Sequence, residues 1–597
     1  MKMKTEIKMK RNIIGSLLVL ASAPLFVSCL EESMPTSIAV QKQVETTEGK
    51  EGLANAIPYY LNSYSSSYSY DIGFGGFKIW RDASTGDMPI YSLAYDYFYY
   101  VEQAEYLGAD WQLQYTIWQR YYSLVKKCNL VLETIDVESN PTDVSPAATA
   151  VAYRANAYME MAEWYEYKLT GYPALDEKAV ADGILGLTVP IVTEKTTEDD
   201  ARNNPRVPFY EMYRFILTDL NNGEEYVNGM TQPSSKMYAG SGVIYGLMAR
   251  FWLTVGTRFE RYPEDLATAM QHETDATIEW DPLGVTTAKD CFVKAAEYAR
   301  KAINVGYTPY SESQWFDPKT GFNTPNSSWM WANIISSDNS LATTTWQSWP
   351  SFMSPETEYG VCNSDYKAWR MIDARLFSKI GKSDWRRTTW IDPADIATSE
   401  DGSTSYGKES AYNEKYARGT NLSYDAWKLT PAYVGFKFHP AQGNISTSSV
   451  GNAISLPLMR VEEMYLIEAE AVGRSQGAAA GRQLLESFVN TYRYTDGSYK
   501  SKGSGLEGFI EDVYDQKRIE FWGEGLIMFD LRRLGMPVER GYDGTNFPSS
   551  TQFNSLPEYV APWTTFSIPE SERDYNPAVK LNPDPSHGTI YSVWEGE

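Results

Sequence analysis

Two carboxylates near the C-terminus are the residues whose types and spacing come closest to catalytic chemistry. Glu520 and Glu524 lie in the sequence "KRIEFWGEG", and a four-residue interval places two side chains on one face of a helix. Such a pair can hydrolyse a glycosidic bond when a cleft gives the two carboxyls opposed environments. Here basic residues alternate with the acidic ones, which favours structural ion pairs over catalysis. The interleaved residues are Arg460, Glu463, Glu468, Glu470, Arg518, Asp530 and Arg532.

No other set of residues has the spacing of a known catalytic or metal site. The three histidines, His272, His439 and His587, are scattered, and the sequence contains no H-E-x-x-H, paired C-x-x-C, G-x-S-x-G or P-loop motif. The glycine cluster "GFGGF" at 73–77 favours a flexible loop over a phosphate cradle. We therefore expect no enzyme activity, no cofactor and no dedicated metal site, although loop carboxylates could still hold an ion.

Aromatic residues are unusually abundant, with 44 Tyr and 18 Trp. Sugars offer apolar C–H faces and hydroxyl edges, so their binding sites combine flat aromatic platforms with polar side chains at the rim. The stretch "SYSYDIGFGGFKIWRDASTGD" fits this pattern and is expected to form a loop. Its candidate ligand-binding residues are Tyr70, Trp80, Arg81 and Asp82.

A second stretch, "SQWFDPKTGFNTPNSSWMWANIISSDNSLATTTWQSWP", holds five tryptophans among Asn and Ser residues. Trp329 and Trp331 alternate as on a strand, which predicts that both face the same side. The alternative is that most of these rings pack the segment against neighbouring helices. We expect at least one of them to contribute to a ligand platform. The candidates are Trp315, Trp329, Trp331, Trp346 and Trp349.

Helical periodicity predicts the scaffold that positions these stretches. Helical patterns run from about 50 to 310 and from 451 to 597, and read as antiparallel helix pairs. One helix is predicted to begin at Ser145 and to end at Gly171 and Pro173. Residues 311–450, rich in Trp, Ser, Asn and Gly, predict an irregular insertion. Function is expected there, because rigid scaffolds tend to carry binding residues on loops.

The N-terminus reads as an export signal. Basic residues precede an apolar run from Ile13 to Leu20, and the run ends at Val27-Ser28-Cys29, which resembles a bacterial lipobox. We predict a lipoprotein signal peptide over 1–28, lipidation of Cys29, and a polar tether over 29–49. An ordinary secreted protein is the alternative. Glu31 and Glu32 resemble the surface-export signal of Bacteroidetes lipoproteins, which predicts an outer-membrane anchor with the protein facing the cell exterior.

The net charge argues against nucleic-acid partners, and the cysteine content argues against stabilisation by disulfides. The net charge is −24, and removal of a leader with five basic residues and one acidic residue leaves about −28. A protein with this large negative charge repels the phosphate backbone of nucleic acids. Nucleic-acid binding is therefore not expected. Beyond Cys29 only Cys128, Cys291 and Cys362 remain, too few for a disulfide framework. Cys128 and Cys291 lie in helical patterns and are expected to pack in the core.

Several motifs, in order, resemble the SusD/RagB lipoproteins of Bacteroidetes. They include the lipobox at Cys29, the run from Trp118 to Asn129 and the "YRANAY" helix around Arg154. The C-terminal motifs are the most specific. They are "PLMRVEEMYLIEAEA" at 457–471, "LLESFVNTYR", "KRIEFWGEGLIMFDLRRLG" and "FSIPESERDYNP".

The resemblance implies a mainly α fold with tetratricopeptide-like helix pairs and an irregular, aromatic-rich inserted subdomain. It makes 50–597 a single domain. It also implies a surface lipoprotein that captures oligosaccharides for a SusC-like TonB-dependent outer-membrane transporter. One alternative is peptide binding, as in the RagB branch. Another is a structural lid on the transporter with no ligand affinity of its own.

Overall fold

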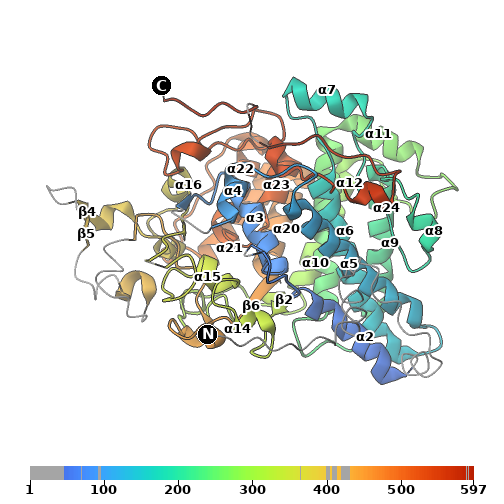
Figure 1. The fold of residues 1–597 in the computed structure, drawn as a ribbon, viewed down its shortest axis with the longest axis horizontal. Coiled ribbons are helices and arrows are strands. Elements are labelled where there is room, and N and C mark those ends of the chain that lie inside the picture. Colours follow the sequence, from blue (N-terminus) through green and yellow to red (C-terminus); the bar gives the residue numbers. More distant parts are fainter. Residues whose placement is uncertain are drawn as a thin grey trace, which may run out of the picture.

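The computed structural model describes residues 46–68, 70–91, 96–363, 365–398, 404–406, 413–418, 430–586, 588 and 590–596. Figure 1 shows these residues as a helical half and a loop-rich half. The predicted leader, Cys29 and most of the predicted tether lie outside the described residues. The first helix, α2 (Thr47–Tyr60), already begins two residues before the expected end of that tether.

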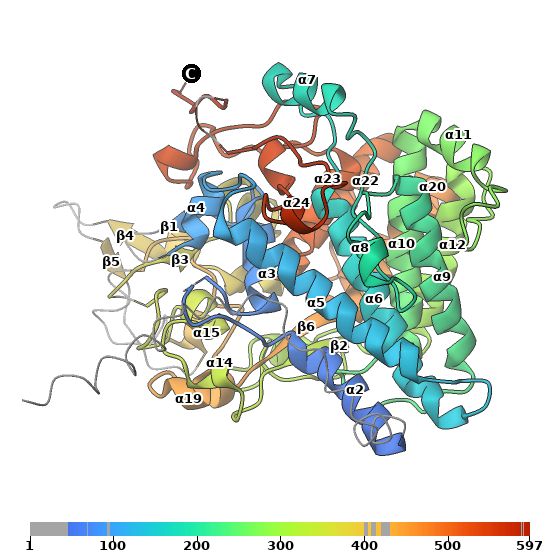
Figure 2. The same ribbon diagram turned by 45° about the vertical axis from the view of Figure 1, so that its right-hand side comes forward.

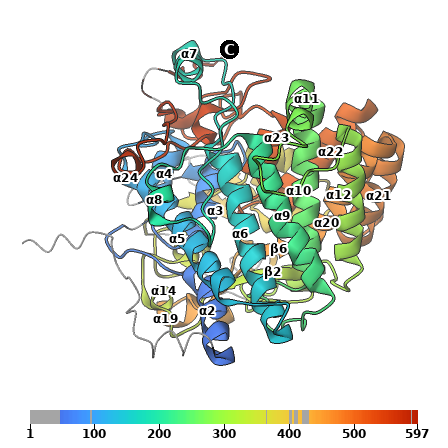
Figure 3. The same cartoon turned by 90° about the vertical axis from the view of Figure 1, so that its right-hand side faces the viewer.

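Long helices packed side by side form the scaffold. α5 packs against α6, α6 against α9, α9 against α10 and α10 against α12, and Figure 3 shows these five helices in one row. α20 packs against α12 and is followed by α21 and α22. The row of helices is therefore completed by a segment that follows the insertion in the sequence. The mainly α fold of packed helices is confirmed. The long helices are α5 (Gln112–Thr134), α6 (Val144–Tyr165), α9 (Phe209–Val227), α10 (Ser241–Arg261), α12 (Ala288–Ile303), α20 (Val461–Gln476), α21 (Ala478–Tyr492) and α22 (Gly505–Glu520).

Shorter elements surround the row. In the scaffold segments they are α3 (Phe74–Ala83), α4 (Phe98–Glu102), α7 (Pro173–Ala181), α8 (Glu198–Ala201), α11 (Pro263–Gln271), α23 (Ile527–Leu534) and α24 (Glu572–Tyr575). Residues 535–596 are mostly irregular, although the periodicity analysis placed them in the helical scaffold. They lie across the ends of the scaffold helices (Figure 1).

The inserted segment contains only short elements. Its helices are α13 (Glu312–Trp315), α14 (Ser340–Thr343), α15 (Trp349–Met353), α16 (Ala374–Lys379) and α19 (Ser448–Gly451). Three two-stranded antiparallel sheets are described, and two of them join the insertion to the scaffold segments. Their strands are β1 (Ile90–Tyr91) with β3 (Trp369–Arg370), β2 (Trp329–Ile334) with β6 (Ser455–Arg460), and β4 (Ile396–Thr398) with β5 (Thr404–Tyr406).

The helix predicted to begin at Ser145 differs at both ends. It begins at Val144 after a 3₁₀ turn, and the Ser145 hydroxyl accepts a hydrogen bond from the Thr231 amide instead of capping the helix. The helix ends at Tyr165, before Gly171. The reason is tertiary: side chains of Arg206 and Asn582 donate to the Tyr165 carbonyl, which satisfies that helix end away from the local stop signals.

One large hydrophobic core extends through both halves of the molecule. Cys128 and Cys291 lie in it, as expected, and Cys362 is also buried and unpaired. Among the described residues, no helix has the length and apolar character needed to cross a bilayer.

Candidate functional site

The carboxylate pair of the C-terminal block is a buried ion cluster. α22 ends at Glu520, and Glu524 follows in a turn, so the prediction that one helix face carries both is wrong. Arg460 brings them together instead, with its Nη1 3.0 Å from a Glu520 oxygen and its Nη2 2.8 Å from a Glu524 oxygen. Arg386, Arg493 and Lys437 complete the cluster at 2.6–2.9 Å. The interpretation as structural ion pairs is confirmed.

The electrostatics of this cluster do not suit acid–base catalysis. Burial by itself would raise the pKa of Glu520, but the guanidinium groups of Arg493, Arg460 and Arg386 hold it well below its usual value. A catalytic acid needs the opposite shift and access to the substrate. The side chain of Glu520 is completely buried. The cluster therefore holds the insertion, α20, α21 and α22 together.

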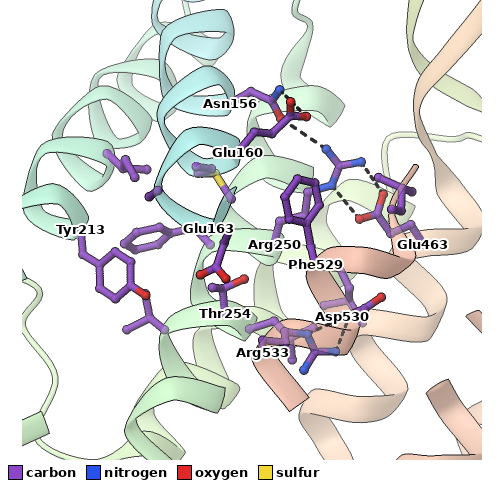
Figure 4. A pocket seen from close by; sticks show the side chains of 18 of the residues that line it. Asn156, Glu160, Glu163, Tyr213, Arg250, Thr254, Glu463, Phe529, Asp530 and Arg533 are labelled. Atoms are coloured by element: carbon purple, nitrogen blue, oxygen red, sulfur yellow. Dashed lines mark hydrogen bonds and ion pairs between the residues drawn. The ribbon is translucent and has the colours of Figure 1, made fainter. Parts of the chain in front are cut away.

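Charged side chains also line a crevice between α6, α10, α20 and α23, which Figure 4 shows from close by. Its volume is about 90 Å³, well below the several hundred cubic ångströms of a typical ligand pocket. Arg250 binds both oxygens of Glu463 at 2.6 Å, and Arg533 binds Asp530 at 2.6 Å. These matched pairs make the crevice a part of the helix packing. No group of three or more His, Cys, Asp or Glu side chains in the described part of the chain could hold a metal ion.

The first predicted sugar-binding stretch forms helix α3 instead of a loop. All ten residues of α3 are buried, so Trp80, Arg81 and Asp82 offer no surface to a ligand. Arg81 pairs with Glu160 at 2.5 Å, and Asp82 accepts a hydrogen bond from the Gly525 amide at 3.0 Å. Small residues explain the burial: a side chain at Gly75 would contact Leu456 at 3.2 Å. Of the four candidates in this stretch only Tyr70, in the loop before α3, stays partly exposed.

Four of the five tryptophans in the second stretch are also core residues. Trp329 and Trp331 lie on β2, but a bulge separates them in the pairing with β6 and they contact different neighbours. The Trp329 indole donates to the Tyr310 hydroxyl at 2.6 Å, and the Trp331 indole to the Met237 carbonyl at 3.2 Å. For these residues the packing alternative describes the structure. The buried four are Trp315, Trp329, Trp331 and Trp349, each at most 2% exposed, whereas Trp346 is 40% exposed.

An unbroken series of aromatic rings lies where the loop before α3 meets α4 and the start of α5. Each ring centroid is within 6.0 Å of the next, and the closest pair, Tyr106 and Trp111, is 4.3 Å apart. We call this series the aromatic row. Its members are Tyr68, Tyr70, Tyr97, Tyr100, Tyr106 and Trp111. The last four are 37–46% exposed. Figure 2 shows α4 between β1 and the start of α5, at one side of the molecule.

The backbone that presents the aromatic row is strained. Ala104 and Tyr106 have φ angles of 53° and 59°, in the left-handed region that favours glycine. Such conformations persist only where the surroundings hold them, and they gather at binding sites. Here Phe98 and Val101 of α4 are buried as anchors, and Arg540 donates to the carbonyl of Glu102. The rings are therefore held in place before any ligand arrives.

Glu102 supports α4 as an uncharged group. Burial is the main reason that the pKa of Glu102 rises to about 8. One oxygen of its carboxyl group accepts a hydrogen bond from the Ile90 amide at 3.2 Å. The folded protein thus binds this proton more tightly than the unfolded chain, whose glutamate has the usual pKa of 4.5. Stability from this group is complete below pH 4.5 and is lost as pH rises toward 8.

We therefore expect Glu102→Gln to gain stability relative to the wild type as pH rises from 5 to 8. The gain should approach about 1.4 kcal/mol per pH unit, because glutamine has no proton to lose. Urea unfolding at pH 5, 6.5 and 8 measures it. Glu105→Gln, three residues away, is the matched control and should follow the wild-type profile. A difference between Glu102→Gln and wild type that does not change with pH would contradict the prediction.

Trp346 lies in a segment that is hydrogen-bonded to the start of the aromatic row. Its ring packs edge-to-face on Tyr366 with centroids 4.7 Å apart. The adjacent Gln347 side chain donates to the carbonyls of Ser65 and Tyr68 at 3.0 and 2.6 Å, which ties this segment to the first residues of the row. Of the predicted aromatics, Tyr70 and Trp346 keep exposed surface, and the residue after Trp346 is hydrogen-bonded to the loop that carries Tyr70.

Sequence reasoning missed Tyr97, Tyr100, Tyr106 and Trp111. The signal was present in "YSLAYDYFYYVEQAEYLGADW", where aromatic residues are as dense as in the two chosen stretches. In the sequence of this segment, polar residues stand between the rings, at Gln103, Glu105 and Asp110, and none of the three is buried. The aromatic row with this polar rim is the candidate functional site.

The fold and this site define a class of protein: a helical scaffold with an irregular insertion, which presents a pre-formed aromatic surface. Two family models match the chain. One, described as "SusD family", matches residues 290–584, and another, described as "Starch-binding associating with outer membrane", matches residues 80–253. Together they extend over most of the described residues. The chain belongs to the SusD/RagB family.

Solved structures share the fold. A SusD-like carbohydrate binding protein from Bacteroides vulgatus is 20% identical with a TM-score of 0.59, covering 92% of this chain and 99% of its own. A SusD superfamily protein from Bacteroides thetaiotaomicron is 18% identical with a TM-score of 0.60, covering 90% and 100%. One from Parabacteroides distasonis is 15% identical with a TM-score of 0.59, covering 90% and 98%. No curated protein matches the chain.

Proposed function

We propose that this protein is a cell-surface lipoprotein that binds glycans through the aromatic row. It captures oligosaccharides and delivers them to a SusC-like TonB-dependent transporter in the outer membrane. It has no catalytic turnover of its own. The observation that carries the proposal is the row itself, a series of partly exposed rings held on strained backbone, with amide and carboxylate residues between them in the sequence.

The chemistry of the row suits sugars. Exposed Tyr and Trp faces can cover the apolar faces of successive sugar units, while Gln103, Glu105 and Asp110 can meet hydroxyl groups. An extended series of rings suits a chain of sugar units better than a single small molecule. The family description and the name of the Bacteroides vulgatus relative support a carbohydrate ligand.

The membrane part of the proposal rests on the sequence and on the family. Cys29 at the end of the predicted leader is the proposed lipidation site, and several acyl chains are needed for a stable anchor. The second family description, which includes association with the outer membrane, supports that location. The acidic residues after Cys29 support an outward orientation. Peptide capture and a lid without ligand affinity remain the competing functions.

Affinity electrophoresis tests the proposal. Residues 30–597, which omit the leader and Cys29, are run through gels that contain plant, host-mucin or microbial polysaccharides. We expect retardation by at least one polysaccharide and none by bovine serum albumin or casein added in the same way. Absence of retardation by every polysaccharide would contradict glycan binding and favour peptide capture or a lid that acts only with its transporter.

A further inference from the structure

A polar cavity lies in a part of the molecule that shares no residue with the aromatic row. It opens between α16, the loop 380–383, the loop 494–502 and α22, and has a volume of about 500 Å³. That volume is within the roughly 300–1,000 Å³ of small-molecule sites. Its walls carry hydroxyl and charged groups, and two tyrosines, Tyr494 and Tyr499, whose rings meet edge-to-face at 5.4 Å.

The charges of the cavity are unbalanced in favour of cations. Four lysines line it, Lys379, Lys382, Lys500 and Lys502, against two aspartates. Both aspartates are already engaged. Asp515 binds the ammonium of Lys379 at 2.7 Å, and Asp512 accepts hydrogen bonds from the Ser501 hydroxyl at 2.5 Å and the Gly503 amide at 2.8 Å.

Two of the lysines are left for a ligand. Lys500 pairs with Glu486 at 2.9 Å, whereas Lys382 and Lys502 have no acidic partner among the described residues. In a chain with a net charge of −24, two unmatched ammonium groups lie on the rim of one cavity. They would attract an anionic group and repel a cation.

The cavity wall is shaped in advance. A Cβ atom at Gly381 would lie 2.2 Å from the Tyr494 hydroxyl, so only glycine lets that ring lie against the loop. The amide of Trp385 donates to the Arg493 carbonyl, and the Ser383 hydroxyl donates to Asp496 at 2.5 Å, which fixes the two loops to one another. Aromatic surface, hydroxyl groups and free cations are thus held in one site.

We propose that this cavity binds an acidic sugar, a monosaccharide unit that carries a carboxylate or a sulfate group. Lys382 and Lys502 bind the anionic group, Tyr494 covers an apolar face of the ring, and Ser378, Ser383 and Ser498 meet its hydroxyls. That the anion belongs to a sugar rests on the proposed function, whereas the preference for an anion rests on the lysines alone.

Ligand-observed NMR at low salt tests the inference with residues 30–597 and three probes: glucuronate, glucose 6-sulfate and glucose. We expect binding of at least one acidic probe and none of glucose. Binding of glucuronate alone or of glucose 6-sulfate alone supports the site and identifies its anion as a carboxylate or a sulfate. Lys382→Gln/Lys502→Gln should weaken that binding at least tenfold. Lys195→Gln/Lys289→Gln, which removes the same charge from exposed positions elsewhere, is the matched control and should bind like the wild type.

The inference is overturned if neither acidic probe binds, if glucose binds equally well, or if the control variant loses as much affinity as Lys382→Gln/Lys502→Gln. The two proposals fail separately. Retardation by a neutral polysaccharide without binding of acidic sugars would leave the aromatic row in place and refute the cavity. Binding of acidic sugars through the lysines without retardation by any polysaccharide of the panel would leave the cavity in place and refute the aromatic row.

Discussion

Glu520→Ala is expected to lower the free energy of unfolding by about 3–5 kcal/mol, because it leaves buried cations without their counter-charge. The Glu520 carboxylate contacts the guanidiniums of Arg386 at 2.9 Å, Arg493 at 2.8 Å and Arg460 at 3.0 Å. All four side chains are at most 1% exposed, so water cannot replace the lost partner. Urea unfolding followed by tryptophan fluorescence at pH 7 measures the loss.

The control for this variant lies on the same helix. Glu511→Ala removes an exposed carboxylate from α22 and should change stability by less than about 0.5 kcal/mol. The pH dependence gives an independent check wherever both proteins give a full unfolding curve. Because the pKa of Glu520 is held below the usual 4.5, its contribution is complete above pH 4.5 and is lost as pH falls. The difference in unfolding free energy between wild type and Glu520→Ala should therefore become smaller below pH 4.5. A difference under about 1 kcal/mol at pH 7 would refute the stabilising role of the ion cluster.

What the sequence predicts well is the part of the fold that local periodicity determines. The run from Trp118 to Asn129 belongs to α5, and the four-residue interval between Glu470 and Arg474 on α20 brings their charged groups within 3.0 Å. The strand at Trp329 was also predicted from alternation. In each of these cases neighbours in sequence are neighbours in space, so a pattern of residue types carries the information.

Local periodicity does not predict which individual aromatic side chains are buried. "GFGGF" reads as a loop because glycine disfavours helix, yet Gly75 and Gly76 allow α3 to lie against Leu456 and the Tyr70 backbone. That contact involves a residue nearly four hundred positions away. The same tertiary packing covers Trp80 and Trp315 but leaves Trp346 and Trp111 in contact with water. Composition could therefore indicate an aromatic binding surface without indicating which rings form it.

Trp111→Ala is expected to weaken binding of the retained glycan roughly 10- to 30-fold, about 1.4–2 kcal/mol. Trp111 ends the aromatic row and is 43% exposed, so its face is available without any rearrangement of the core. Removing the second exposed ring in Tyr97→Ala/Trp111→Ala should abolish retardation, because sugar units would then lose contact at two separate points along the row. Affinity electrophoresis with the retained polysaccharide, over a series of concentrations, gives the dissociation constants.

The matched control is Tyr575→Ala, which removes a ring that is 67% exposed on α24, outside the row. It should bind like the wild type, and Trp111→Phe should keep most of the affinity because the aromatic face is retained. This pair of variants separates stacking on the row from a general effect of surface aromatics. If Tyr575→Ala lost as much affinity as Trp111→Ala, or if Trp111→Ala bound normally, the glycan would have to bind elsewhere. The strained backbone at Ala104 and Tyr106 would then need another reason, such as contact with the transporter.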